Sequence, residues 1–182
     1  MTMELTLNSN TKIEFGFGKL VAGKEQQVFA EYFPAIRPAM EEYSLQSLHP
    51  FAILATNCDG PVPTQGSFAQ APSIKNYEAF HQDARFLAAK PLRDEGMEFL
   101  DGGSFFDAVD AVIELNDDQD YAIIIENGNS LSTAPMLQLM ADEHSPSTKY
   151  IGKRLALHPW SEEAEQLLAS SQVIVFRVRF LA

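Results

Sequence analysis

Apolar and polar residues alternate over 12–22 (KIEFGFGKLVA), and this period of two predicts a strand with one buried face. The same pattern predicts strands over 48–57 and 64–71. The turn 58–63 between them is rich in Gly and Pro, so the two strands are expected to form a hairpin. Alternation returns over 105–115 and predicts a fourth strand.

Between these strands the apolar spacing becomes helical. Residues 23–43 read as a helix that Pro34 and Pro38 are expected to kink. A second helix is expected after Ser73, a good N-cap residue, with Gly96 as its C-terminal stop. The resulting β-α-β-β-α-β order predicts an α+β, ferredoxin-like antiparallel sheet with both helices on one face. The other face of the sheet then needs a cover.

The last third of the chain is less regular. Its expected elements are a strand over 121–127 that pairs with the fourth strand, a helix over 134–144, a strand or arm over 150–159, a helix over 160–171 and a strand over 172–180. We expect a ferredoxin-like domain over 1–115 and a C-terminal α/β extension over 116–182, packed on that domain or completing it. A fused tandem of two units is disfavoured because the two halves do not align.

Composition narrows the class of protein. The 182 residues suit one domain, and the single cysteine, Cys58, rules out an intrachain disulfide. The net charge of −12 argues against binding to nucleic acid or to anionic membranes. Eleven acids and no Lys or Arg occur over 94–126, which is typical of a solvated acidic rim. No secretory pattern or membrane-length apolar run is present, so a cytoplasmic location is expected.

One longer motif suggests a family. The pattern F-x-x-D-x-R-F over 80–86, followed by PLRDEGMEFLDGGSFF over 91–106, lies between two predicted strands. It resembles the second helix and last strand of the dimeric α+β barrel superfamily, nearest to its small stress-associated and unknown-function branches. The resemblance covers roughly residues 12–115.

The resemblance implies a homodimer whose two sheets close a barrel, with a pocket between each sheet and its helices. A monomer sealed by its own C-terminal third is the alternative to that dimer. The superfamily includes cofactor-independent monooxygenases, lactone isomerases, haem-dependent chlorite-degrading enzymes and ligand-sensing domains, so the fold does not choose the chemistry.

Three side chains on the second helix are candidates for chemistry. Tyr77, His81 and Arg85 follow one another at intervals of four, so they are expected to share a helix face. Together they are suited to moving a proton or holding a carboxylate. The alternative is a hydrated helix surface without a function.

Candidate ligand contacts are His49, Phe15, Phe17 and Phe80. The alternative for His49 is a plain turn residue before Pro50. The four histidines are scattered without a helix-spaced pair, so no metal site and no cofactor are expected.

Two arginines near the C-terminus also need an explanation. Arg177 and Arg179 share one face of the last predicted strand, and like charges this close require an anion opposite them. We expect Asp110 and Glu114 to supply it, which would bring the last strand to the main sheet. An anionic ligand is the alternative.

Two functions remain open from the sequence. The first is an uncharacterised α+β barrel protein that binds a small hydrophobic or aromatic molecule between sheet and helices. The second is a cofactor-independent monooxygenase- or isomerase-like enzyme that uses the same pocket. The sequence alone does not decide whether the protein is an enzyme.

Overall fold

The computed structural model describes residues 1–182. Its strands are β1 (Thr2–Leu7), β2 (Lys12–Leu20), β3 (Gln46–Thr56), β4 (Gln65–Ala71), β5 (Met97–Asp107), β6 (Ala111–Asn116), β7 (Tyr121–Glu126), β8 (Leu137–Ala141), β9 (Arg154–Pro159) and β10 (Ile174–Phe180). Its helices are a π-helical turn η1 (Gln27–Tyr32), α1 (Phe33–Glu42), α2 (Ile74–Gln82), α3 (Ala84–Gly96) and α4 (Glu162–Leu167). None of these helices is long and apolar enough to cross a membrane.

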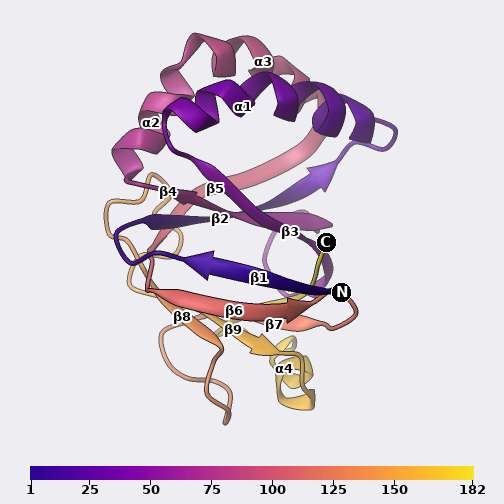
Figure 1. Ribbon diagram of the computed structural model, residues 1–182. Helices are drawn as coiled ribbons and strands as arrows, with labels where there is room; N and C mark the ends of the chain where they lie inside the picture. The colour runs from indigo at the N-terminus through magenta and orange to yellow at the C-terminus, as the bar shows by residue number, and fades with distance from the viewer.

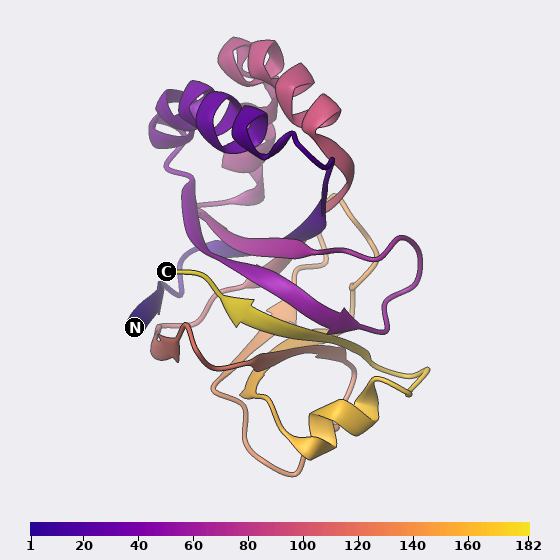
Figure 2. The same ribbon diagram turned by 90° about the vertical axis from the view of Figure 1, so that its right-hand side faces the viewer.

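The first half of the barrel, residues 12–107, has the predicted β-α-β-β-α-β order. Its sheet runs β3-β4-β2-β5 with every neighbouring pair antiparallel, which is the ferredoxin-like arrangement. Helices α1, α2 and α3 lie together on one side of these strands, whereas α4 lies at the opposite end of the molecule (Figures 1 and 2). The ferredoxin-like sheet with helices on one face is therefore confirmed.

The second half, residues 121–180, repeats that strand order. Its strands run β8-β9-β7-β10, the same second-third-first-fourth sequence as in the first half. Antiparallel pairs β5–β8 and β10–β3 join the halves into one closed eight-stranded barrel. The structure is thus larger than a simple ferredoxin-like sheet, and it has the two-unit arrangement that the sequence disfavoured.

Closure within one chain changes the expected assembly. The barrel that a homodimer was expected to form from two sheets is completed here by β7–β10 of the same chain. A second copy is therefore not needed to cover the first sheet, and the oligomeric state stays a prediction. The division into domains at residue 115 also stays a prediction, although residues 116–182 supply half of the barrel strands.

Aromatic and aliphatic side chains fill the barrel. Phe15 lies at its centre, fully buried, with the rings of Phe51, Phe68 and Phe176 at centroid distances of 6.2, 5.7 and 5.3 Å. Each such ring contributes roughly 1.5–3 kcal/mol through its burial. Phe15 and Phe17 therefore belong to the packed interior, because the apolar face of β2 points into the barrel and its polar face points toward the helices.

Several predicted boundaries were wrong. The single strand over 105–115 is broken after Asp107, and β6 instead pairs with β1, a strand that was not predicted. The strand over 121–127 pairs with β9 and β10 rather than with the strand before it. The region predicted as a helix over 134–144 contains the strand β8 instead. Leu137 and Leu139 are buried in alternation and pair with Leu157 and Leu155 of β9.

The helix signals were more accurate. The Ser73 hydroxyl accepts a hydrogen bond from the Asn76 N–H at 3.1 Å, so the predicted N-cap is confirmed. A cap of this kind is worth about 1 kcal/mol. Pro34 has no N–H to donate, and in the turn before it the Phe33 N–H bonds to the Val28 carbonyl, five residues back. Helix α4 is shorter than predicted, ending at Leu167.

Candidate functional site

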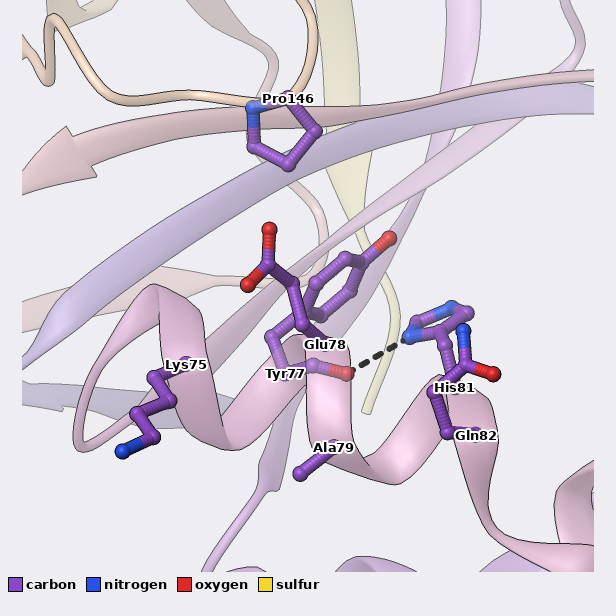
Figure 3. Close-up of a pocket in the computed structure, with 7 residues that line it drawn as sticks. All are labelled: Lys75, Tyr77, Glu78, Ala79, His81, Gln82 and Pro146. Atoms are coloured by element: carbon purple, nitrogen blue, oxygen red, sulfur yellow. Dashed lines mark hydrogen bonds between the residues drawn. The ribbon is translucent and has the colours of Figure 1, made fainter.

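A depression of about 500 Å³, wide open to solvent, lies beside α2. Figure 3 shows the side chains of Tyr77, Glu78 and His81 directed to one side of this helix, with Pro146 facing them from the β8–β9 loop. Two of the three proton-handling candidates predicted from the sequence therefore line one hollow. Ser73 is the N-cap of α2 and so fixes where the helix that carries these side chains begins.

A hydrogen bond within its own helix fixes the tautomer of His81. Its Nδ1 lies 2.9 Å from the Tyr77 carbonyl oxygen, which can only accept, so Nδ1 donates and Nε2 is left as an acceptor (Figure 3). The rings of Tyr77 and Phe86 lie 4.0 and 4.4 Å from the imidazole centroid. This burial lowers the pKa of His81, although the bond to the Tyr77 carbonyl opposes the effect. A neutral imidazole lines the depression near neutral pH.

Arg85 does not join this group. Its guanidinium bonds to Asp83 (Nε to Oδ1, 2.9 Å) and to Glu42 (Nη2 to Oε2, 2.6 Å). The interval of four residues predicted a shared face only if one helix continued through 77–85. The backbone is extended at Asp83, where α2 ends and α3 begins, so Arg85 is carried away from Tyr77 and His81. The prediction that all three share a face was wrong.

A charged side chain that sequence reasoning missed lies behind Tyr77. Glu14 points from β2 toward the helices, and its Oε1 accepts a hydrogen bond from the Gly103 N–H at 2.8 Å. Burial raises the pKa of Glu14, while the Gly103 N–H, the Tyr77 hydroxyl and the charge of Arg93 oppose that rise. The sequence signal that could have revealed Glu14 is its position on β2, on the face opposite the apolar one.

Two phenols and one glycine complete the surroundings of Glu14. Burial raises the pKa of both Tyr32 and Tyr77, so each hydroxyl stays protonated and able to donate. Gly103 has φ of +77°, a backbone conformation that a residue with a Cβ rarely adopts. Its carbonyl accepts a hydrogen bond from the Ser147 N–H at 2.9 Å, which ties the β8–β9 loop to the strand that holds Glu14.

The remaining ligand candidates lie elsewhere. The His49 Nε2 donates to the Glu4 carbonyl at 3.1 Å, beside β1. Phe80 is buried in the core between the helices and the sheet, and Phe15 and Phe17 are inside the barrel. None of these four side chains lines the depression. No group of three or more His, Cys, Asp or Glu side chains is arranged to hold a metal ion.

The arginine pair near the C-terminus has a different partner from the one expected. Arg177 and Arg179 both donate through Nε to Asp120, each at 2.8 Å, rather than to Asp110 or Glu114. Asp120 lies in the turn before β7, and β7 pairs with β10, so the turn brings the acid to the arginines. The expectation that the last strand joins the main sheet is confirmed by its pairing with β3.

No protein-family model and no curated protein matches this sequence. Among solved structures, a chlorite dismutase variant from Candidatus Nitrospira defluvii is 8% identical with a TM-score of 0.48, covering 94% of this chain and 92% of that one. A provisionally named monooxygenase from Fusobacterium nucleatum is 11% identical with a TM-score of 0.48 and coverage of 94% and 93%. A dimeric protein of unknown function with a ferredoxin-like fold, from Bacteroides fragilis, is 11% identical with a TM-score of 0.36 and coverage of 59% and 96%. All three scores are low, so the fold assignment rests on the strand order of this chain.

Proposed function

We propose that this protein binds a small hydrophobic or aromatic molecule in the depression beside α2. The observation that supports the proposal is the pair of rings of Tyr77 and His81, with centroids 4.0 Å apart and planes tilted by 46°, lining a hollow of about 500 Å³. A volume in this range matches that of ordinary small-molecule sites. The lowered pKa of His81 keeps its imidazole uncharged at neutral pH.

The experiment is a titration of the ¹⁵N-labelled full chain with a panel of small aromatic compounds. We expect shifts of the α2 amides and of those beside Pro146, and we expect them to disappear in His81→Ala. His144→Ala is the matched control, because its side chain is 78% exposed and lies outside the depression. A panel that leaves the α2 amides unmoved would contradict the proposal.

The second candidate function is a cofactor-independent monooxygenase- or isomerase-like enzyme. The observation that favours it is the free Nε2 of a neutral His81, which is the form of imidazole that takes a proton. In an isomerisation, Nε2 would remove a proton next to a substrate carbonyl, leaving an enolate, and return it at another carbon. Exchange of such protons in D2O, present in the wild type and lost in His81→Ala, is the expected result; equal exchange in both would contradict it.

The setting of this function is also a proposal. We propose that the protein is cytoplasmic and that it does not bind nucleic acid, because its net charge is −12. If it is a homodimer, the dimer uses an outer surface, since the barrel is already closed. Light scattering on the purified chain gives the oligomeric state directly.

A further inference from the structure

Two exposed phenylalanines stack on the surface of the helical layer. They belong to the helical segment 25–42, which continues without a break through η1 and α1. Phe29 and Phe33 are 53% and 39% exposed, and their ring centroids lie 5.9 Å apart with planes 17° from parallel. Val28 and Tyr32 of the same segment are buried among the helices instead. The segment lies at the end of the molecule away from the barrel, so the two rings form an apolar patch open to solvent (Figure 1).

Charges of opposite sign flank the two rings. Glu25 lies four residues before the first ring and Arg37 four residues after the second, so all four side chains follow one another along one side of the helix as a stripe. Both charged residues are exposed, and no ion pair within the chain involves either of them. They lie about 18 Å apart along the helix, so they do not pair with each other in one molecule.

The order of residues in the stripe is complementary to itself. When two copies of the segment lie antiparallel about a two-fold axis at residue 31, positions equally far from residue 31 face each other. Phe29 then faces the partner's Phe33, and Glu25 faces the partner's Arg37. Glu31, the acid at the axis, lies two residues from Phe29 and so on nearly the opposite side of the helix. The two copies of Glu31 therefore do not meet, and the antiparallel contact joins rings to rings and acids to bases.

We propose that this stripe, from Glu25 to Arg37, is the contact surface of a homodimer with two-fold symmetry. A contact of this kind closes on itself and so forms dimers rather than chains of molecules. The inference is independent of the proposed function, because none of the four residues lines the depression beside α2. Two helix flanks bury less than the roughly 800 Å² per partner of a standard interface, so we expect a weak dimer with a Kd of roughly 10–100 µM.

The test is sedimentation of the full chain at concentrations from about tenfold below to about tenfold above the expected Kd. Glu25→Arg should weaken the dimer at least about tenfold, because both ion pairs of the dimer become pairs of like charge. Arg37→Glu should weaken it as much for the same reason. The chain that carries both changes should dimerise within about threefold of the wild type, since each acid again faces a base.

A mixture of the two single variants is the sharpest form of this test. One variant carries a base at both positions and the other an acid at both, so the mixture should form heterodimers although neither variant dimerises well alone. The residues are too far apart in one chain for this rescue to arise within a molecule. Association in the mixture no tighter than in either variant alone would overturn the proposal.

The apolar centre of the contact has its own variant and control. Phe29→Ser reduces the rings at the dimer axis from four to two and should weaken the dimer at least about tenfold. Val112→Ser changes a side chain that is 64% exposed on β6, outside the helical layer, and should leave the Kd unchanged.

Two further outcomes would overturn the proposal. One is a chain that stays monomeric at the highest concentration. The other is a dimer whose Kd ignores both Phe29→Ser and the charge variants, because another surface would then form it. If Phe29→Ser does not fold, the mixture of charge variants still decides, since those variants keep both rings and change only exposed side chains.

Discussion

The two halves of the barrel share a strand order but cover their outer faces in opposite ways. In the first half, the outer face of the central strand β2 carries Glu14, Gly16 and Gly18 beneath α1–α3. In the second half, the outer face of the matching strand β7 carries Ala122 and Ile124, both fully buried.

The covering layers explain the difference. In the second half, Leu131 from the loop after β7 and Ala164 from the short α4 pack directly on Ala122 and Ile124 as one dry cluster. In the first half, the helices pack mainly on one another through Val28, Phe86 and their neighbours, and Glu14 keeps partial exposure beneath them. The two halves therefore share a strand order, whereas the outer face of the central strand keeps partial exposure at Glu14 in the first half and is buried at Ala122 and Ile124 in the second.

The largest expected effect comes from emptying the dry layer of the second half. Ile124→Ala should lower the free energy of unfolding by about 2–5 kcal/mol, because it leaves a cavity at a fully buried site. Leu54→Ala is the matched change in the first half; its side chain is 47% exposed, and its cost should stay below about 1 kcal/mol. Chemical denaturation of both variants measures the difference, and equal losses would mean that the two outer layers are packed alike.

The next effect distinguishes two glycines on the outer face of β2. A Cβ added to Gly18 would lie 2.4 Å from the Phe99 carbonyl oxygen, whereas at Gly16 the nearest atom, the Asp101 carbonyl oxygen, is 3.4 Å away. Gly18→Ala should cost about 1–3 kcal/mol through forced movement of the backbone. Gly16→Ala should stay within about 0.5 kcal/mol. Thermal unfolding of the pair tests this, and a costly Gly16→Ala would show that the space above β2 is filled.

A smaller effect is expected at the ion pair of the second half. Burial raises the pKa of Asp120, but hydrogen bonds from Arg177 and Arg179 outweigh it and hold the pKa below its ordinary value. The stabilisation is therefore present above the ordinary Asp pKa and is lost as pH falls through the lowered one.

Asp120→Asn should lower the free energy of unfolding by about 1–2 kcal/mol at pH 7. The loss is no larger because the two arginines are partly exposed, so water solvates their charges when the carboxylate is removed. The loss should shrink toward pH 3. Asp118→Asn, two residues away and exposed, is the control. A cost for Asp120→Asn that does not change with pH would argue against the ion pair as its source.

The sequence predicted those features that depend on neighbouring residues. Period two defined β2, and the hydroxyl of Ser73 marked the start of α2. The proximity of Arg177 and Arg179 correctly required an acid, but the choice of Asp120 depends on how β7 pairs with β10. Local spacing contains no information about such long-range register.

The candidate site was only half predictable for the same reason. Tyr77 and His81 lie in one helix, so their spacing was sufficient to bring them together. Arg85 was misplaced because the backbone breaks at Asp83, and Glu14 was missed because its importance depends on helices that cover a second face of the sheet. The repeated strand order was hidden as well, since a loop and the short α4 replace the longer helices of the first half.

The smallest expected effect tests whether burial of Glu14 on the outer face of β2 lowers the stability of the protein. Because burial raises the pKa of Glu14, the folded protein binds more protons than the unfolded one above the ordinary Glu pKa. Stability therefore falls as pH rises through the raised pKa.

Glu14→Gln removes this titration and should stabilise the protein by up to about 1 kcal/mol at pH 8, with no gain near pH 4. Denaturation curves of both proteins across this range give the difference at each pH. A variant that is less stable than the wild type at pH 8 would mean that attraction to Arg93 exceeds the cost of burial, and that β2 presents a carboxylate held by an ion pair, as Asp120 is held in the second half.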